Sequence, residues 1–177
     1  MKRNVLALLC AAVFLGGCGY ATRIVPASLA GMKTIYVEPF KNSVDYETEK
    51  GSKNLYVPMM EVKVTNATVN RFVTDGFLKI AKPQDADLCL KGELIDYQRD
   101  VLRYDDNDDV QEYRITVIVK LTLLNTRTNE ALWVEPAFAG DATYFPTGSN
   151  ATSESAAINK AVQDLAQRII ERTVEDW

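Results

Sequence analysis

The sequence predicts an α+β fold, a two-layer sandwich with two helices packed on one face of a mostly antiparallel sheet of about four strands. Apolar and polar residues alternate from Tyr113 to Leu123, which is the pattern of a strand with one buried and one solvated face. Apolar residues after Ser153 recur with the period of an α-helix. The elements follow in the order strand, helix, strands, helix, so both helices can cover one apolar sheet face.

The N-terminus has the pattern of a bacterial lipoprotein signal peptide. Lys2 and Arg3 precede an apolar run from Val5 to Leu15, which is shorter than the roughly 20 residues needed to span a bilayer. The sequence LGGC at residues 15–18 resembles the lipobox, in which the cysteine is diacylated, the chain is cut before it and the new amine is acylated. We expect residues 1–17 to be a signal peptide and Cys18 to carry the membrane anchor. The alternative is a plain secreted protein with an incidental cysteine at this place.

The rest of the chain, residues 18–177, has the length of a single domain, which we expect to lie in the periplasm. Removal of Lys2 and Arg3 takes the formal net charge from −4 to −6, which argues against a nucleic-acid-binding surface. The sequence contains no histidine, which excludes Ser-His-Asp and Cys-His nucleophiles and the usual zinc sites. We expect no metal and no cofactor, and we favour a function that is not enzymatic, while chemistry that uses carboxylates alone stays open on composition. We expect Cys89 to be a small buried apolar residue.

The first strand and the first helix follow from local residue preferences. Residues 34–40 (TIYVEPF) are rich in β-branched and aromatic side chains and are ended by a proline, so they predict a strand. The polar residues 41–57 indicate a loop. Pro58 is tolerated in a first helical turn and Gly76 is a typical stop, so we expect a helix between them. The apolar residues at helical spacing in this segment are Met59, Val62, Val69, Phe72 and Val73.

A long strand is predicted from Asp87 to Arg103. Its first apolar face consists of Leu88, Leu90 and Leu94. The alternation then changes phase, because Ile95 and Tyr97 fall on the opposite face. A bulge or a bend after Leu94 would bring the two halves into one pattern.

The acidic segment DDNDD at residues 105–109 follows this strand. Its spacing resembles a calcium loop, but Val110 stands where glycine is needed and Thr116 stands where the bidentate glutamate is needed. We interpret the segment as a solvated hairpin turn.

The second half of the chain predicts a hairpin and a final helix. A turn at residues 125–129 separates the strand at Tyr113 to Leu123 from a partner strand that begins at Ala131 and continues to Phe145. Strands joined by such a short turn pair antiparallel. Ser153 is placed to cap the last helix, which runs nearly to Trp177. The apolar face of this helix comprises Ile158, Ala161, Val162, Leu165, Ile169 and Val174.

Several segments in this order resemble the LptE family of lipopolysaccharide-assembly lipoproteins. They are CGY at residues 18–20, IYVEPFKN at 35–42, ADLCLKG at 86–92 after Asp85, EYRI at 112–115, LNTRTNEALW at 124–133, and the terminal helix with AI at 157–158, DLA at 164–166 and Trp177. The likeness covers nearly all of the chain after the signal peptide. The loop at residues 41–56 and the acidic turn are less typical of the family.

The resemblance implies an α+β sandwich in the periplasm that is lipidated into the outer membrane. There it would plug the β-barrel LptD and help to insert lipopolysaccharide into the outer leaflet. Gly19, directly after the lipidated cysteine, is compatible with sorting to the outer membrane.

Such a role calls for a hydrated surface that fits a barrel lumen and for cations that bind lipopolysaccharide phosphates. The polar face of the strand from Tyr113 to Leu123 provides Arg114, Thr116, Lys120 and Thr122. Arg99 and Arg103 are four residues apart, and we expect them on one strand face. Lys91 and Lys120 can join them if their strands are neighbours. The candidate phosphate-binding residues are Arg99, Arg103, Arg114, Lys120 and Lys91.

Two other functions stay open from the sequence. A carboxylate-based hydrolase of envelope glycans would need two acidic side chains about 5 to 9.5 Å apart in a cleft. The best pairs are Asp96 with Asp100 and Glu93 with Glu112. The other alternative is a scaffold lipoprotein that binds a periplasmic protein through its sheet edge.

Overall fold

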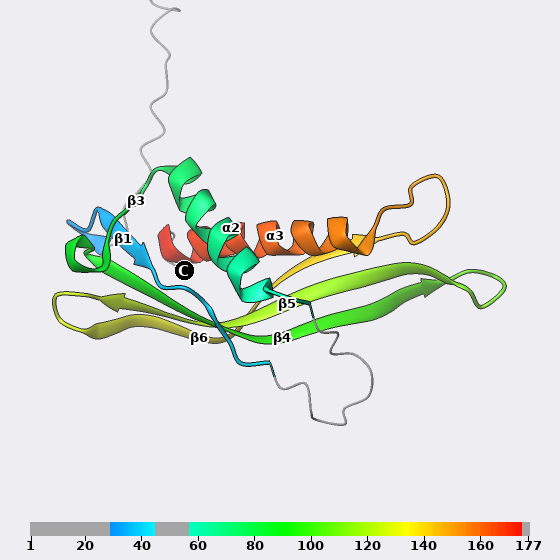
Figure 1. The fold of residues 1–177 in the computed structure, drawn as a ribbon, viewed down its shortest axis with the longest axis horizontal. Helices are drawn as coiled ribbons and strands as arrows, with labels where there is room; N and C mark the ends of the chain where they lie inside the picture. Colours follow the sequence, from blue (N-terminus) through cyan, green and yellow to red (C-terminus); the bar gives the residue numbers. More distant parts are fainter. Residues whose placement is uncertain (1–28, 45–56, 175–177) are drawn as a thin grey trace, which may run out of the picture.

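The computed structural model describes residues 29–44 and 57–174, which form one sheet and two long helices (Figure 1). The predicted signal peptide and Cys18 lie outside the described residues. In chain order the elements are β1 (Thr34–Val37), β2 (Lys41–Asn42), α2 (Met60–Asp75), β3 (Lys79–Ile80), the 3-10 helix η2 (Pro83–Asp85), β4 (Leu88–Tyr104), β5 (Val110–Asn125), β6 (Glu130–Tyr144) and α3 (Glu154–Val174).

The sheet is mixed and has the order β3-β1-β4-β5-β6, with β2 also paired to β4. The long strands β4, β5 and β6 are antiparallel neighbours, whereas β1 runs parallel to β3 and β4, and β2 runs parallel to β4. The predicted α+β sandwich is confirmed, but the described part of the sheet has six strands and not about four. Strands β2 and β3 are two residues long, so they are too short to show an alternation in the sequence.

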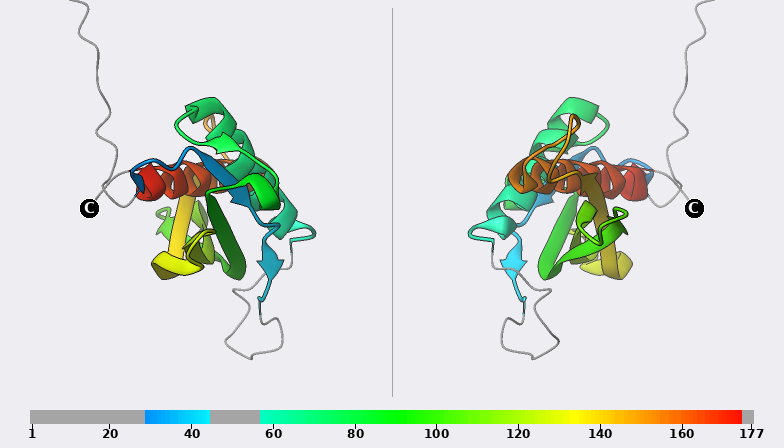
Figure 2. Two further views of the ribbon diagram at one scale, coloured as in Figure 1. Left: turned by 90° about the vertical axis from the view of Figure 1, so that its left-hand side faces the viewer. Right: turned by 90° about the vertical axis from the view of Figure 1, so that its right-hand side faces the viewer.

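Both helices cover the same face of the sheet, as the edge-on views in Figure 2 show. Helix α3 packs mainly along β6 and β5, and α2 packs beside α3. The core lies between these layers, where the inward side chains of β5 are fully buried: Ile115, Val117, Val119, Leu121 and Leu123. The predicted apolar face of α3 is confirmed, since Ile158, Ala161, Val162, Leu165 and Ile169 are buried and Val174 packs against the core.

The buried face of α2 differs from the predicted one. It consists of Met60, Val64, Thr68 and Phe72, so among the predicted residues only Phe72 is fully buried. Thr68 tolerates burial because its hydroxyl donates a hydrogen bond to the carbonyl of Val64 at 2.8 Å. Val62 and Val73 are exposed. The spacing of the valines therefore predicted the wrong buried face for this helix.

Two local features align the layers. The bulge expected in β4 lies between Leu94 and Asp96, and it turns Tyr97 into the core, where 2% of its surface is exposed. The predicted cap of α3 is also confirmed, since the Oγ of Ser153 accepts a hydrogen bond from the backbone N–H of Ala156 at 3.2 Å. Together these features fix the start of α3 above the inner face of β4 and β5.

Candidate functional site: the open face of the sheet

The face of the sheet opposite α2 and α3 is covered by no helix of the described ranges (Figure 2). We call this surface, where it is formed by β4 and β5, the open face. The register between β4 and β5 shows which residues lie on this face, because side chains directly opposite each other on neighbouring strands point to the same side of the sheet. The opposed pairs are Lys91 with Thr122, Glu93 with Lys120, Asp96 with Ile118, Gln98 with Thr116, and Asp100 with Arg114.

The open face carries charges of both signs. Lys120 lies 3.8 Å from Glu93, and both side chains are more than 40% exposed, so this ion pair contributes little to stability. Lys91 and Arg114 are exposed on the same face. The condition stated for Lys91 and Lys120 is met, because they lie on the neighbouring strands β4 and β5, where they form a diagonal pair on this surface.

Arg99 and Arg103 do not share a face, so that prediction was wrong. A second irregularity lies between Val101 and Arg103 and reverses the side on which β4 side chains emerge. Arg103 is paired with Glu112, which lies on the open-face side, and its guanidinium is 3.2 Å from that carboxylate. Arg99 instead is paired with Ile115 and points toward the helical layer.

Arg99 belongs to a polar cluster that joins the sheet to the first turn of α3. Its Nη1 donates to the Oε2 of Glu154 at 2.8 Å, and its guanidinium lies 5.2 Å from the ring centre of Tyr113. The hydroxyls of Tyr97 and Tyr144 also donate to Glu154, each at 3.3 Å. Burial, followed by the charge of Glu154, raises the pKa of both tyrosines, so both phenols stay protonated donors.

Sequence reasoning missed this cluster. The residues Arg99 and Glu154 are 55 positions apart, and no local pattern marks Glu154 as anything other than a charged residue in a first helical turn. A glutamate at a helix start is favourable in itself because of the helix dipole. Its three partners became visible only with the sheet register.

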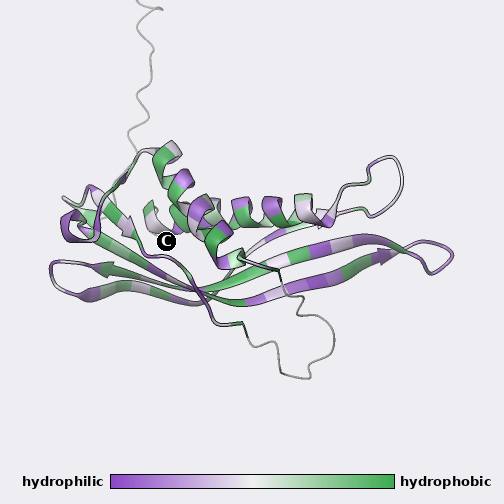
Figure 3. Ribbon diagram, in the orientation of Figure 1, coloured by the Kyte–Doolittle hydropathy of each residue, from purple (hydrophilic) through white to green (hydrophobic). Residues whose placement is uncertain are grey.

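Residues 101–109, at the far end of the β4–β5 hairpin, are exposed throughout. The acidic segment is a hairpin turn, as expected, because the Oδ1 of Asp105 accepts hydrogen bonds from the backbone N–H groups of Asn107 and Asp109 at 2.9 and 3.0 Å. Figure 3 shows hydrophilic residues gathered toward this end of β4 and β5. Three exposed apolar side chains interrupt them: Val101, Leu102 and Tyr104.

At the opposite end of β4, Asp87 ties this strand to β1. Its Oδ2 accepts hydrogen bonds from the backbone N–H groups of Lys33 and Thr34 at 2.9 and 3.2 Å and from the Thr34 hydroxyl at 2.9 Å. Its other oxygen pairs with Arg127. These contacts, with the Lys33 N–H first among them, lower the pKa of Asp87 to about 2. The carboxylate holds the start of the parallel pair in register.

Cys89 lies next to this junction on the open-face side of β4 and is partly buried, so the expectation of a buried residue holds only in part. Burial raises the pKa of its thiol above the ordinary value. The thiol is therefore protonated near neutral pH.

The carboxylate pairs suggested for a hydrolase do not have the required geometry. Asp96 and Asp100 are four residues apart along one strand, which corresponds to about 13 Å. The register places Glu93 opposite Lys120 and Glu112 opposite Arg103, so these two glutamates are separated by ten positions of β4, or roughly 30 Å. Both separations exceed the roughly 5 to 9.5 Å that such catalysis needs.

The fold and this surface define the class of the protein: a small α+β sandwich whose long-stranded sheet has one face covered by helices and one face open. Residues 32–173 match the family model LptE, which is described as lipopolysaccharide-assembly. The match covers most of the chain, and the chain therefore belongs to the LptE family. The resemblance stated from the sequence motifs is confirmed.

Solved structures show the same fold at low sequence identity. A protein from Xanthomonas campestris aligns with a TM-score of 0.57 and 13% identity over 84% of this chain and 87% of its own. An uncharacterised lipoprotein B from Nitrosomonas europaea aligns with a TM-score of 0.56 and 11% identity over 89% of this chain and 90% of its own. A hypothetical protein from Chlamydia trachomatis aligns with a TM-score of 0.53 and 16% identity over 80% of this chain and 95% of its own. No curated protein sequence matches the chain.

Proposed function

We propose that this protein is a non-enzymatic outer-membrane lipoprotein that plugs an LptD-like β-barrel and assists the insertion of lipopolysaccharide. The observation that carries the proposal is the match of residues 32–173 to the lipopolysaccharide-assembly family. In this proposal residues 1–17 are removed as a signal peptide, and residues 18–177 form the periplasmic domain.

The membrane attachment in this proposal rests on Cys18. In the parts of the chain that the structure describes, no helix combines the length and the apolar character needed to cross a bilayer. Each buried methylene of an acyl chain contributes about 0.8 kcal/mol, and one chain alone binds only marginally. The diacylated and N-acylated cysteine of a lipobox carries three acyl chains, which suffice for a stable anchor.

The open face is the surface that we assign to the barrel lumen and to lipopolysaccharide. Its mixed charges favour a hydrated contact, as a barrel lumen offers. Lys91, Lys120 and Arg114 are exposed there, and Arg103 emerges on the same side. We propose that these four cations bind lipopolysaccharide phosphates. Arg99 faces the helices and is engaged by Glu154, so we assign it to the positioning of α3.

The experiment that tests this function is purification of the full-length chain from detergent-solubilised envelopes. We expect a stable complex with an outer-membrane β-barrel at near-equal amounts. A Cys18→Ala variant is the matched control, because it removes the acylated thiol and leaves residues 32–173 intact. Recovery of the lipidated wild-type protein without a barrel partner would contradict the proposal.

A further inference from the structure

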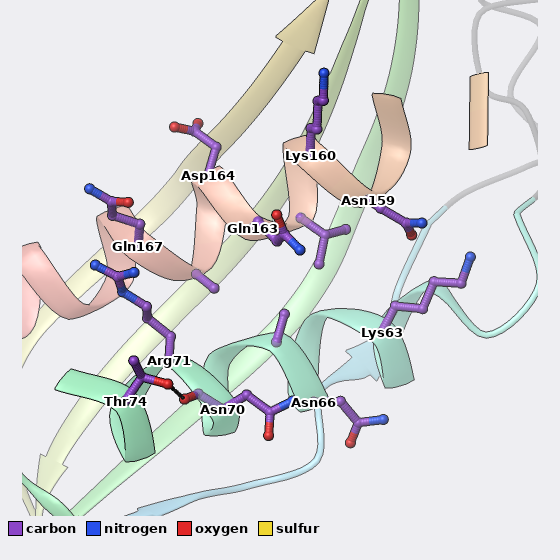
Figure 4. Close-up of a pocket in the computed structure, with 13 residues that line it drawn as sticks. Lys63, Asn66, Asn70, Arg71, Thr74, Asn159, Lys160, Gln163, Asp164 and Gln167 are labelled. Carbon is purple, nitrogen blue, oxygen red and sulfur yellow. Dashed lines mark hydrogen bonds between the residues drawn. The ribbon is translucent and has the colours of Figure 1, made fainter. Parts of the chain in front are cut away.

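A groove of about 790 Å³ runs between α2 and α3, on the layer opposite the open face (Figure 4). Its volume lies in the range of roughly 300–1,000 Å³ that is usual for small-molecule sites. Helix α2 contributes Lys63, Asn66, Ala67, Asn70, Arg71 and Thr74, and α3 contributes Asn159, Lys160, Val162, Gln163, Asp164, Ala166 and Gln167.

Five of the ten polar residues that line the groove carry carboxamides. Each offers two N–H donors and one carbonyl acceptor, which matches the donor and acceptor pairs of neighbouring sugar hydroxyls. Gln167 already donates to Glu171 at 2.8 Å. The side chains of Asn66, Asn70, Asn159 and Gln163 make no hydrogen bond within the described part of the chain.

The groove also carries an excess of positive charge. Lys63, Arg71 and Lys160 line it, and Asp164 is the acidic residue among the lining side chains. That carboxylate is engaged elsewhere, because its Oδ2 accepts hydrogen bonds from Arg168 at 2.8 Å and from the backbone N–H of Asp141 at 3.0 Å. The uncompensated cations therefore favour an anionic group in the groove.

Arg71 is the most informative of these cations. Its side chain extends from α2 toward α3 and Gln167, across the space between the helices (Figure 4). Its Nε is buried and finds no hydrogen-bond partner among the described residues. A buried guanidinium N–H without a partner is costly, and an anionic oxygen in the groove would satisfy it.

We propose that the α2–α3 groove binds an anionic saccharide, meaning a hydroxyl-rich ring that carries a phosphate or a carboxylate. The carboxamides bind the hydroxyls, Arg71 binds the anionic group, and the small apolar side chains of Ala67, Val162 and Ala166 contact a ring face. Two envelope polymers supply this chemistry, the phosphorylated core of lipopolysaccharide and the carboxylated strands of peptidoglycan. The groove and the open face are separate surfaces, so this site does not depend on barrel docking.

Calorimetric titration of the purified full-length chain in detergent tests the site. The probes are a deacylated, phosphorylated core oligosaccharide, a muramic-acid-containing disaccharide, the neutral disaccharide maltose, and inorganic phosphate. We expect one of the two anionic saccharides to bind at least 10-fold more tightly than maltose or phosphate alone. Which of them does so identifies the natural source. Equal binding of phosphate, or no saccharide binding at all, would overturn the proposal.

Two variants assign the binding to the groove. Arg71→Gln removes one charge-assisted contact, and we expect an affinity loss of about 10-fold or more. Gln163→Glu places a negative charge in the groove at an exposed helix position that tolerates it, and we expect at least the same loss with an unchanged unfolding midpoint. Lys82→Gln removes an exposed charge outside the groove and should leave the affinity unchanged.

Unchanged affinity in both Arg71→Gln and Gln163→Glu would show that the saccharide binds elsewhere and would overturn this assignment. Co-purification of the barrel with these variants is a separate readout. Loss of saccharide binding with intact barrel recovery distinguishes the failure of the groove from the failure of the proposed function.

Discussion

The contact between β6 and α3 depends on the absence of a side chain at Gly140. This residue is buried beneath α3, and a Cβ added to it would clash with the backbone nitrogen and Cβ of Leu165 and would lie 2.5 Å from its Cα. Because these atoms belong to the body of the helix, no side-chain rotation relieves the clash. Substitution by alanine must therefore displace α3 from the sheet.

We expect Gly140→Ala to lower the free energy of unfolding by about 3 kcal/mol, at the upper end of the usual cost of overpacking. For a domain of this size each kcal/mol corresponds to roughly 2–4 °C, so the melting temperature should fall by about 6–12 °C. Thermal unfolding followed by circular dichroism measures this shift. Thr143→Ala, an exposed position in the same strand, serves as the control and should shift the midpoint by less than about 2 °C.

A Gly140→Ala variant that melts within about 2 °C of the wild type would refute this reasoning. It would show that α3 and β6 do not approach each other as closely as the structure has them. A second observation distinguishes overpacking from a backbone effect. Ala142→Gly in the same strand introduces no clash, so it should lower the free energy of unfolding by only about 1 kcal/mol.

Three further predictions concern polar contacts. The pKa of Asp87 is lowered to about 2, so its stabilising contribution is complete above about pH 4 and is lost as the pH falls toward 2. Because the site is near the surface, Asp87→Asn should lower the free energy of unfolding, measured in urea at pH 7, by only about 1–2 kcal/mol. If the stability difference between this variant and the wild type stayed constant down to pH 2, it would not come from the Asp87 carboxylate. Glu154→Ala removes the carboxylate that accepts hydrogen bonds from three side chains, so it should lower the free energy of unfolding by about 1–2 kcal/mol and speed hydrogen exchange in the first turn of α3. Unchanged exchange in that turn would contradict the role of the cluster. Arg114→Glu should weaken binding to lipopolysaccharide about 10-fold in a surface-binding assay, with Lys82→Glu as the control. Equal losses of affinity in both variants would show that only the net charge matters and that Arg114 makes no specific contact.

The parts of the fold that the sequence predicted are those with a long, regular pattern. The strand from Tyr113 to Leu123 and the final helix each have six or more apolar residues in one period, so chance spacing does not obscure them. The bulge after Leu94 was also visible, because it changes the phase of the alternation. Local chemistry sufficed for the cap at Ser153.

The parts that could not be predicted depend on contacts between distant segments. The opposite orientation of Arg99 and Arg103 follows from an irregularity near Val101 that leaves no clear mark in the sequence. The buried face of α2 includes Thr68, whose polarity conceals its position until its hydroxyl is seen bonded to the helix backbone. The α2–α3 groove arises only because two helices far apart in the chain lie side by side.

Site-specific photo-crosslinking in intact cells tests the central proposal, that the open face contacts an outer-membrane barrel. The full-length chain would carry a photoreactive amino acid in place of Arg114 or Lys120, which are exposed on that face. We expect irradiation to yield an adduct with a β-barrel protein at either position, identified by mass spectrometry. Adducts that contain only other envelope proteins, or no adduct at either position in a lipidated chain, would contradict the account.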